Sequence, residues 1–186
     1  MAIALVEDAL RIAAGEIGVR EEPPGSNRSE RIDEYIRAAG LDPEDPFRRG
    51  KKRGYPYCAA LLVWTFARAA RKHGIASPCP RTAKVARLWQ RAPAWARTKT
   101  PARGAIFIHL LDPNDPESDG HAGIVEHVIL GTPGFLLTIE GNTGPQGAVG
   151  QDDRDGDGVR AKRRELKYVN VGYLDFSRAP AASLDG

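Results

Sequence analysis

One of the two cysteines in the chain, Cys58, stands where a cysteine nucleophile could be built. It follows Pro56-Tyr57 and directly precedes a strongly apolar run that predicts a helix. A helix N-terminus carries a partial positive charge and unpaired N–H groups, which favour a thiolate and can receive an oxyanion. The alternative is a small buried hydrophobe, because free cysteine is among the most buried residue types. Cys58 is therefore a candidate nucleophile that needs a base.

Two predicted strands, 121–129 and 135–140, bring such a base beside polar partners. Side chains alternate along a strand, so Glu140 and Asn142 project to one face where the second strand ends. If the two strands pair as a hairpin, the start of the first lies beside the end of the second. His121 then lies next to Glu140 and Asn142, and it could accept the proton of the Cys58 thiol. Taken singly, His121 would be interpreted as a satisfied strand-end histidine and Glu140 as a loop carboxylate.

Three short blocks carry a resemblance to a known family, and it extends over roughly residues 5 to 175. The blocks are Pro56-Tyr-Cys-Ala-Ala-Leu61, Gly120-His-Ala-Gly-Ile-Val125 and Ile139-Glu-Gly-Asn-Thr143. In order and spacing they resemble the signature blocks of CHAP domains, which are amidase and peptidase modules related to the NlpC/P60 group of papain-like cysteine peptidases. One departure is Tyr57, because many close members carry tryptophan directly before the cysteine.

The resemblance implies cleavage of an amide or peptide bond of bacterial peptidoglycan through an acyl-enzyme. By match of position, Cys58 is the nucleophile, His121 the general base and Glu140 the residue that orients His121. Asn142 is a further polar member, and whether it or Glu140 orients the base stays open. No cofactor is implied, and no motif decides between an amidase and an endopeptidase. Two alternatives are a thiol acyltransferase or amidase acting on another amide, and a non-catalytic wall-binding module.

The elements that must position these residues are helices first and strands later. Apolar periodicity predicts helices over 4–17, from Asn27 as N-cap to about 39, over 58–73, and from Thr82 as cap to Pro93. Strands are predicted over 105–110, 121–129, 135–140 and 167–175. This order predicts an α+β fold, and the resemblance implies the papain-like NlpC/P60/CHAP arrangement of N-terminal helices on an antiparallel sheet. We expect one catalytic domain over 1–178 and a flexible tail over 179–186.

The composition and charge of the chain limit the classes of binding partner that we expect. The chain has 186 residues, a net charge of +3 and a sequence pI of about 9.0. Few aromatic residues and no RNA-binding spacing argue against nucleic acid, and we expect a monomer. A basic cluster is either a solvated loop or a contact for an anionic wall polymer; it comprises Arg48, Arg49, Lys51, Lys52 and Arg53.

Metal binding is not the preferred interpretation of either candidate motif. Asp153, Asp155 and Asp157 fit the start of a calcium loop, but the twelfth position holds Arg164 rather than glutamate. We interpret this segment as a polar turn and keep calcium binding as the alternative. His121 and His127 lie about 20 Å apart along one strand, so a zinc ion shared with His109 is not expected. Cys79, between Pro78 and Pro80, is expected to pack a loop.

Targeting signals are missing from the sequence pattern. No apolar run approaches the ~20 residues of a membrane-spanning helix. The N-terminal residues lack the basic region of a conventional secretory signal. We therefore expect synthesis in the cytoplasm and delivery to the wall by a non-classical route, such as a holin, a phage particle or a secretion system.

Overall fold

The fold is described by a computed structural model over residues 1–45, 54–145 and 156–179. Its α-helices are α1 (Ala2–Gly15), α2 (Glu30–Ala38), α4 (Cys58–Lys72) and α5 (Val85–Arg91). Its strands are β1 (Arg97–Thr98), β2 (Ile106–Leu110), β3 (Gly120–Ile129), β4 (Phe135–Thr143), β5 (Gly158–Glu165) and β6 (Gly172–Leu174). Short 3-10 turns are found before β1 at η1 (Ala94–Ala96), between β5 and β6 at η2 (Leu166–Tyr168), and after β6 at η3 (Phe176–Arg178).

The described strands form one six-stranded sheet in the order β1-β6-β2-β3-β4-β5. Every neighbouring pair is antiparallel, so the predicted α+β class is confirmed. β3 and β4 pair as the predicted hairpin, with Ile124 opposite Ile139 and Ile129 opposite Phe135. The start of β3 therefore lies near the end of β4, where the candidate polar side chains are.

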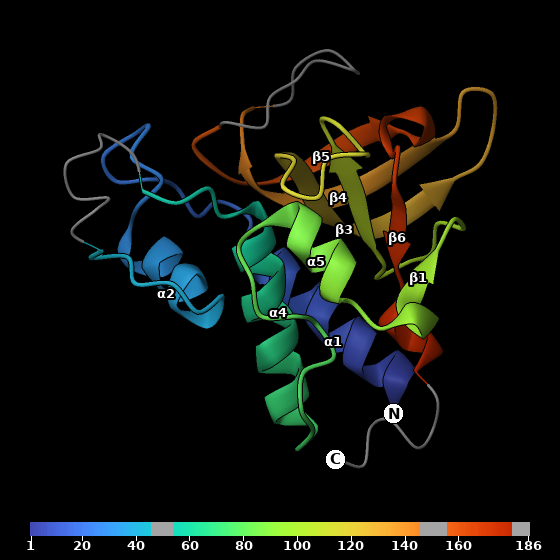
Figure 1. The fold of residues 1–186 in the computed structure, drawn as a ribbon, viewed down its shortest axis with the longest axis horizontal. Helices are drawn as coiled ribbons and strands as arrows, with labels where there is room; N and C mark the ends of the chain where they lie inside the picture. The colour runs from blue at the N-terminus through green and yellow to red at the C-terminus, as the bar shows by residue number, and fades with distance from the viewer. Residues whose placement is uncertain (46–53, 146–155, 180–186) are drawn as a thin grey trace.

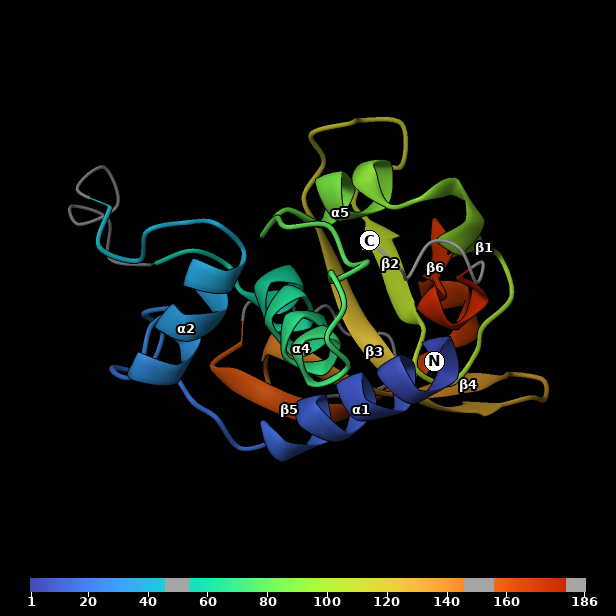
Figure 2. The same ribbon diagram turned by 90° about the horizontal axis from the view of Figure 1, so that it is seen from below.

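Helix α4 occupies the centre of the molecule, between α2 and the sheet (Figures 1 and 2). It is apolar on nearly every side of its first half, which explains why residues 58–66 are all buried. Trp64 packs edge-on against Tyr35 of α2, and Phe66 packs edge-on against Phe176. This packing fixes the helix on opposite sides and so fixes the position of its first residue.

Strand β5 was not predicted, because most of its side chains are charged and its few apolar residues do not alternate with polar ones. It pairs with β4, and its Lys162 and Arg164 lie on the buried side while Ala161 and Arg163 are exposed. The predicted strand over 167–175 is wrong in extent, because residues 166–168 form η2 and only Gly172–Leu174 join the sheet. A search for apolar alternation cannot find a strand whose buried positions are cationic.

Three predicted helix ends also differ from the structure. α1 spans Ala2–Gly15 rather than 4–17. Ser29, not Asn27, caps α2, because the Ser29 side chain accepts the Ile32 N–H, and Asn27 has the left-handed φ of 55°. Thr82 accepts the Lys84 N–H at 3.1 Å, and the helix begins only at Val85. The errors at Asn27 and Thr82 come from polar side chains that serve the turn before the helix.

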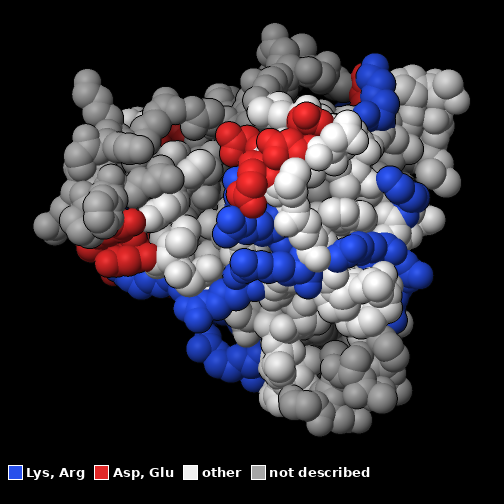
Figure 3. All heavy atoms as spheres, viewed as in Figure 1, with Lys and Arg blue, Asp and Glu red and all other residues white. Residues whose placement is uncertain are grey.

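Basic side chains gather in a band across the face that presents α4 and α5, beside a smaller acidic group (Figure 3). On this part of the chain, Lys84 and Arg87 pair with Glu117. The basic cluster predicted over 48–53 lies outside the described residues. Among the described helices, none has the length and apolarity needed to cross a membrane.

Candidate active site

Cys58 is the first residue of α4, as the sequence predicted. Its thiol is free and the residue is 4% exposed. The first main-chain bond of the helix runs from the Leu61 N–H to the Tyr57 carbonyl at 2.9 Å. Helix geometry leaves the N–H groups of the first turn, starting with that of Cys58, without partners inside the helix. The sulfur therefore lies beside donors that can stabilise an oxyanion.

The turn before Cys58 is held by a buried network around Tyr57. The Tyr57 hydroxyl donates to Glu21 at 3.4 Å, and the second oxygen of Glu21 accepts the Asn27 N–H at 2.9 Å. The backbone N–H of Asn142 also bonds to the Tyr57 hydroxyl. Burial raises the pKa of the Glu21 carboxyl. Tyr57 thus ties the helix start to both the N-terminal segment and the end of β4.

His121 is fully buried and its imidazole is bonded to Glu140. Nε2 lies 2.8 Å from Oε2 of Glu140, which leaves Nδ1 for the thiol. Nδ1 has no formed hydrogen bond within the described residues, although Cys58 is near enough to act on the ring electrostatically. Such contacts are often long before substrate binds. Burial alone would lower the pKa of His121, but the Cys58 sulfur and the Glu140 carboxylate outweigh burial and raise it to about 9.

Glu140 is held in place by more than the histidine. Its Oε1 accepts the Nε–H of Arg164 at 3.0 Å and the Thr138 hydroxyl at 2.6 Å, while its Oε2 accepts an Nη2–H of Arg164 at 2.6 Å. Burial would raise the pKa of the Glu140 carboxyl, but the bonds from His121 and Arg164 lower it to about 2. Glu140 is therefore a fixed carboxylate at neutral pH.

Asn142 lies close to this network through its backbone. It is 4% exposed, has the left-handed φ of 56°, and accepts the Gly156 N–H at 3.2 Å through its carbonyl. The structure thus brings Glu140 into direct contact with the His121 ring and brings the Asn142 backbone to Tyr57. Of the two residues left open as orienters by the sequence, Glu140 makes the bond to the ring.

Arg164 is the member of the site that the sequence did not reveal. It is 3% exposed and its guanidinium faces Tyr168, 4.8 Å from the ring centre. In the sequence, Arg164 stands out only because it occupies the twelfth position of the candidate calcium loop, where a glutamate is expected. A usable signal was the spacing of Lys162 and Arg164, which places two cations on one face of a strand beside a strand that carries a glutamate.

We predict that Gly123→Ala impairs the site by displacing Glu140. A Cβ at Gly123 would come within 2.6 Å of Cγ of Glu140 and 2.7 Å of Cε1 of Phe107. Overpacking of this kind costs about 1–3 kcal/mol of stability, and the displaced carboxylate would also lose its bond to His121. Thermal unfolding and activity should both fall. Gly15→Ala is the matched control, because nothing lies within 4 Å of a Cβ there; equal activity of the two variants would contradict the prediction.

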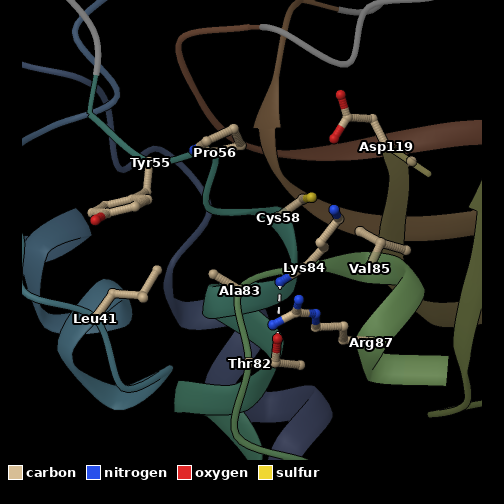
Figure 4. Close-up of a pocket in the computed structure, with 11 residues that line it drawn as sticks. Leu41, Tyr55, Pro56, Cys58, Thr82, Ala83, Lys84, Val85, Arg87 and Asp119 are labelled. Atoms are coloured by element: carbon tan, nitrogen blue, oxygen red, sulfur yellow. Dashed lines mark hydrogen bonds between the residues drawn. The ribbon is translucent and has the colours of Figure 1, made fainter. Parts of the chain in front are cut away.

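A cleft of about 470 Å³ opens above Cys58 (Figure 4). Leu41 and Tyr55 line one side, and Lys84 and Arg87 line the other. Asp119, two residues before the histidine, also lines the cleft. The Cys58 sulfur is thus accessible from a cleft that has an apolar wall of Leu41 and Tyr55 and a charged wall of Lys84 and Arg87.

The described residues contain no group of three His, Cys, Asp or Glu side chains placed to hold a metal ion. Asp153 and Asp155 lie outside the described residues, and Asp157 pairs with Arg160 at 2.5 Å. Nδ1 of His109 lies 2.6 Å from the Tyr168 carbonyl, and His127 is exposed farther along β3. Cys79 is buried, and burial raises the pKa of its thiol.

Comparison with known proteins gives one match. The family model of the CHAP domain matches residues 50–142, half of the chain, and this range includes Cys58, His121, Glu140 and Asn142. Comparisons with curated proteins and with solved structures returned no match. The antiparallel sheet, the helices packed on it and the cysteine at a helix start agree with the papain-like fold of this family. The chain belongs to the CHAP domain family.

Proposed function

We propose that this protein is a cysteine hydrolase that cleaves an amide or peptide bond of bacterial peptidoglycan through an acyl-enzyme. CHAP domains are in general amidases and peptidases of peptidoglycan. The observation that carries the proposal is the geometry of the site: Cys58 at a helix start, near a buried histidine that is fixed by a buried carboxylate. A nucleophile, a base and an orienting group are the parts that thiol catalysis requires.

The proposed reaction starts from a pair in which the thiol proton of Cys58 has already moved to Nδ1 of His121. The thiolate attacks the carbonyl carbon, and the oxyanion that forms faces the N–H groups of the first turn of α4. The His121 imidazolium then protonates the leaving amine as the C–N bond breaks, which leaves a thioester on Cys58. Water attacks the thioester with His121 as base, and the carboxylic acid product leaves with the thiol restored.

We predict that activity persists to a more alkaline pH than an ordinary histidine would allow. The pKa of His121 is raised from its ordinary 6.5 to about 9. The imidazolium that protonates the leaving amine is therefore retained through neutral pH and lost only as the pH rises through about 9. The alkaline limb of kcat/KM against pH reports this group in the free enzyme. An alkaline limb at a pH near 6.5 would contradict the assignment of His121, paired with Glu140, as the group that protonates the leaving amine.

The cleft supports a polymeric, charged substrate such as the peptide stem or cross-bridge of the wall. Lys84, Arg87 and Asp119 supply both signs of charge around Cys58. The basic band across the face with α4 and α5 would favour attraction to anionic wall polymers.

Digestion of purified sacculi tests the proposal. The soluble products are separated and weighed by mass spectrometry, and their masses distinguish release of whole stem peptides by an amidase from release of shortened peptides by an endopeptidase. New muropeptides that appear with the enzyme support the proposal. Binding to sacculi without any new product would favour the wall-binding alternative. Amide cleavage restricted to soluble substrates outside the wall would favour the other-amide alternative.

A further inference from the structure

We infer that Arg164 is a positioning residue of the catalytic site, which keeps Glu140 charged and correctly oriented while His121 gains and loses its proton. The inference deepens the proposed function and rests on it for the roles of Cys58 and His121. Nothing in the family match covers Arg164, because the matched range ends at residue 142. The sequence also gave it no role in catalysis.

The first support is the geometry of the two-bonded fork that the Arg164 guanidinium forms with the Glu140 carboxylate. Nε and Nη2 of Arg164 donate to the two different oxygens of Glu140, at 3.0 and 2.6 Å. Two parallel bonds of this kind fix the plane of a carboxylate as well as its distance. The oxygen that accepts from Nη2 is Oε2, the same atom that lies 2.8 Å from Nε2 of His121. Arg164 therefore fixes the atom that orients the catalytic ring.

The second support is the charge on these groups. Glu140 and His121 are fully buried and Arg164 is 3% exposed. A buried carboxylate with no cationic partner takes up a proton, because desolvation disfavours its charged form. In the proposed cycle His121 is cationic in one half and neutral in the other, so it cannot supply that partner throughout. A guanidinium is always protonated in proteins, so Arg164 supplies a constant positive charge.

The third support is that a neighbouring cation serves another purpose. Lys162 lies two residues earlier on the same buried side of β5 and is 5% exposed. Its ammonium donates to the carbonyls of Gly144 and Pro145, at 3.2 and 3.1 Å. Arg164 and Lys162 thus lie on the same strand and are similarly buried, but only Arg164 contacts Glu140. This makes Lys162→Met a matched control.

The test measures the reactivity of the Cys58 thiol and needs no wall substrate. The rate of alkylation of Cys58 by iodoacetamide is followed from acid to alkaline pH in the folded protein, with peptide mass spectrometry to separate Cys58 from the buried Cys79. In Arg164→Met the loss of the constant cation should let Glu140 become protonated and weaken its support of the His121 imidazolium. We expect the rate profile to move toward alkaline pH by about one unit or more, and Lys162→Met to keep the wild-type profile.

A purely structural role for Arg164 would lower the fraction of folded protein without moving this profile. A wild-type profile in folded Arg164→Met would overturn the inference, and so would an equal shift in Lys162→Met. If Arg164→Met does not fold, Arg164→Lys replaces it: a single ammonium keeps the charge but cannot form the fork, so we expect a several-fold loss of alkylation rate. A wild-type rate in Arg164→Lys would also overturn the inference. Failure to digest sacculi would refute the proposed function and leave this measurement intact.

Discussion

Cys58→Ala is expected to abolish release of muropeptides from sacculi while the protein stays folded. The sulfur supplies the bond to the substrate, and in enzymes of this kind loss of the nucleophile costs about 10⁴-fold or more in rate. Alanine is smaller than cysteine and keeps the helix start, so the buried first turn of α4 can accept it. Product formation by mass spectrometry and thermal unfolding check the two parts of this expectation.

Cys79→Ala is the matched control for this experiment. Cys79 is also a buried free thiol, but it lies in the loop after α4 and takes no part in the site. Its replacement should leave the rate of digestion unchanged. Undiminished digestion by Cys58→Ala would refute the assignment of Cys58 as the nucleophile. Loss of activity in Cys79→Ala alone would indicate that Cys79 is the nucleophile instead.

Glu140→Gln is expected to cause the second largest loss, about 10²- to 10⁴-fold in kcat/KM. Glutamine has the same shape and can still accept a bond from Arg164, but it carries no charge to stabilise the imidazolium of His121. It can also present an N–H to Nε2 and so favour the wrong tautomer. The measurement is kcat/KM on a soluble muropeptide, at a temperature where circular dichroism shows the variant to be folded.

Replacement of Asn142 gives the comparison that decides which residue orients His121. Asn142→Ala should cause a smaller loss than Glu140→Gln, since the bond to the ring comes from Glu140. Because alanine is strained at the φ of 56° found there, Asn142→Gly is measured beside it. A greater loss in both Asn142 variants than in Glu140→Gln would make Asn142 the orienter.

The sequence was sufficient to predict the α+β class and the meeting of His121 with Glu140. Both follow from short-range patterns: an apolar run after Pro56-Tyr57 predicts a buried helix, and strand alternation with a hairpin places the start of β3 near the end of β4. The pairing of β3 with β4 and the distance of 2.8 Å between Nε2 and Oε2 agree with that prediction.

The part that could not be predicted depends on contacts between residues far apart in the chain. β5 has cations at buried positions, and these are stable only because Glu140 and the carbonyls of Gly144 and Pro145 face them. No local rule predicts buried arginine. The prediction of Asn27 as a helix cap is wrong for the same reason, because its bond to Glu21 forms only when the loop is folded.

The most direct test of the central claim is whether hydroxylamine diverts the reaction. A thioester on Cys58 reacts with hydroxylamine as well as with water, so peptidoglycan digested in its presence should yield the hydroxamate of the cleaved carbonyl group beside the free acid. The account predicts that the hydroxamate fraction rises with hydroxylamine concentration for the wild type, and that Cys58→Ala gives neither product. Digestion that yields only the free acid at every hydroxylamine concentration would contradict an acyl-enzyme and with it the role assigned to Cys58.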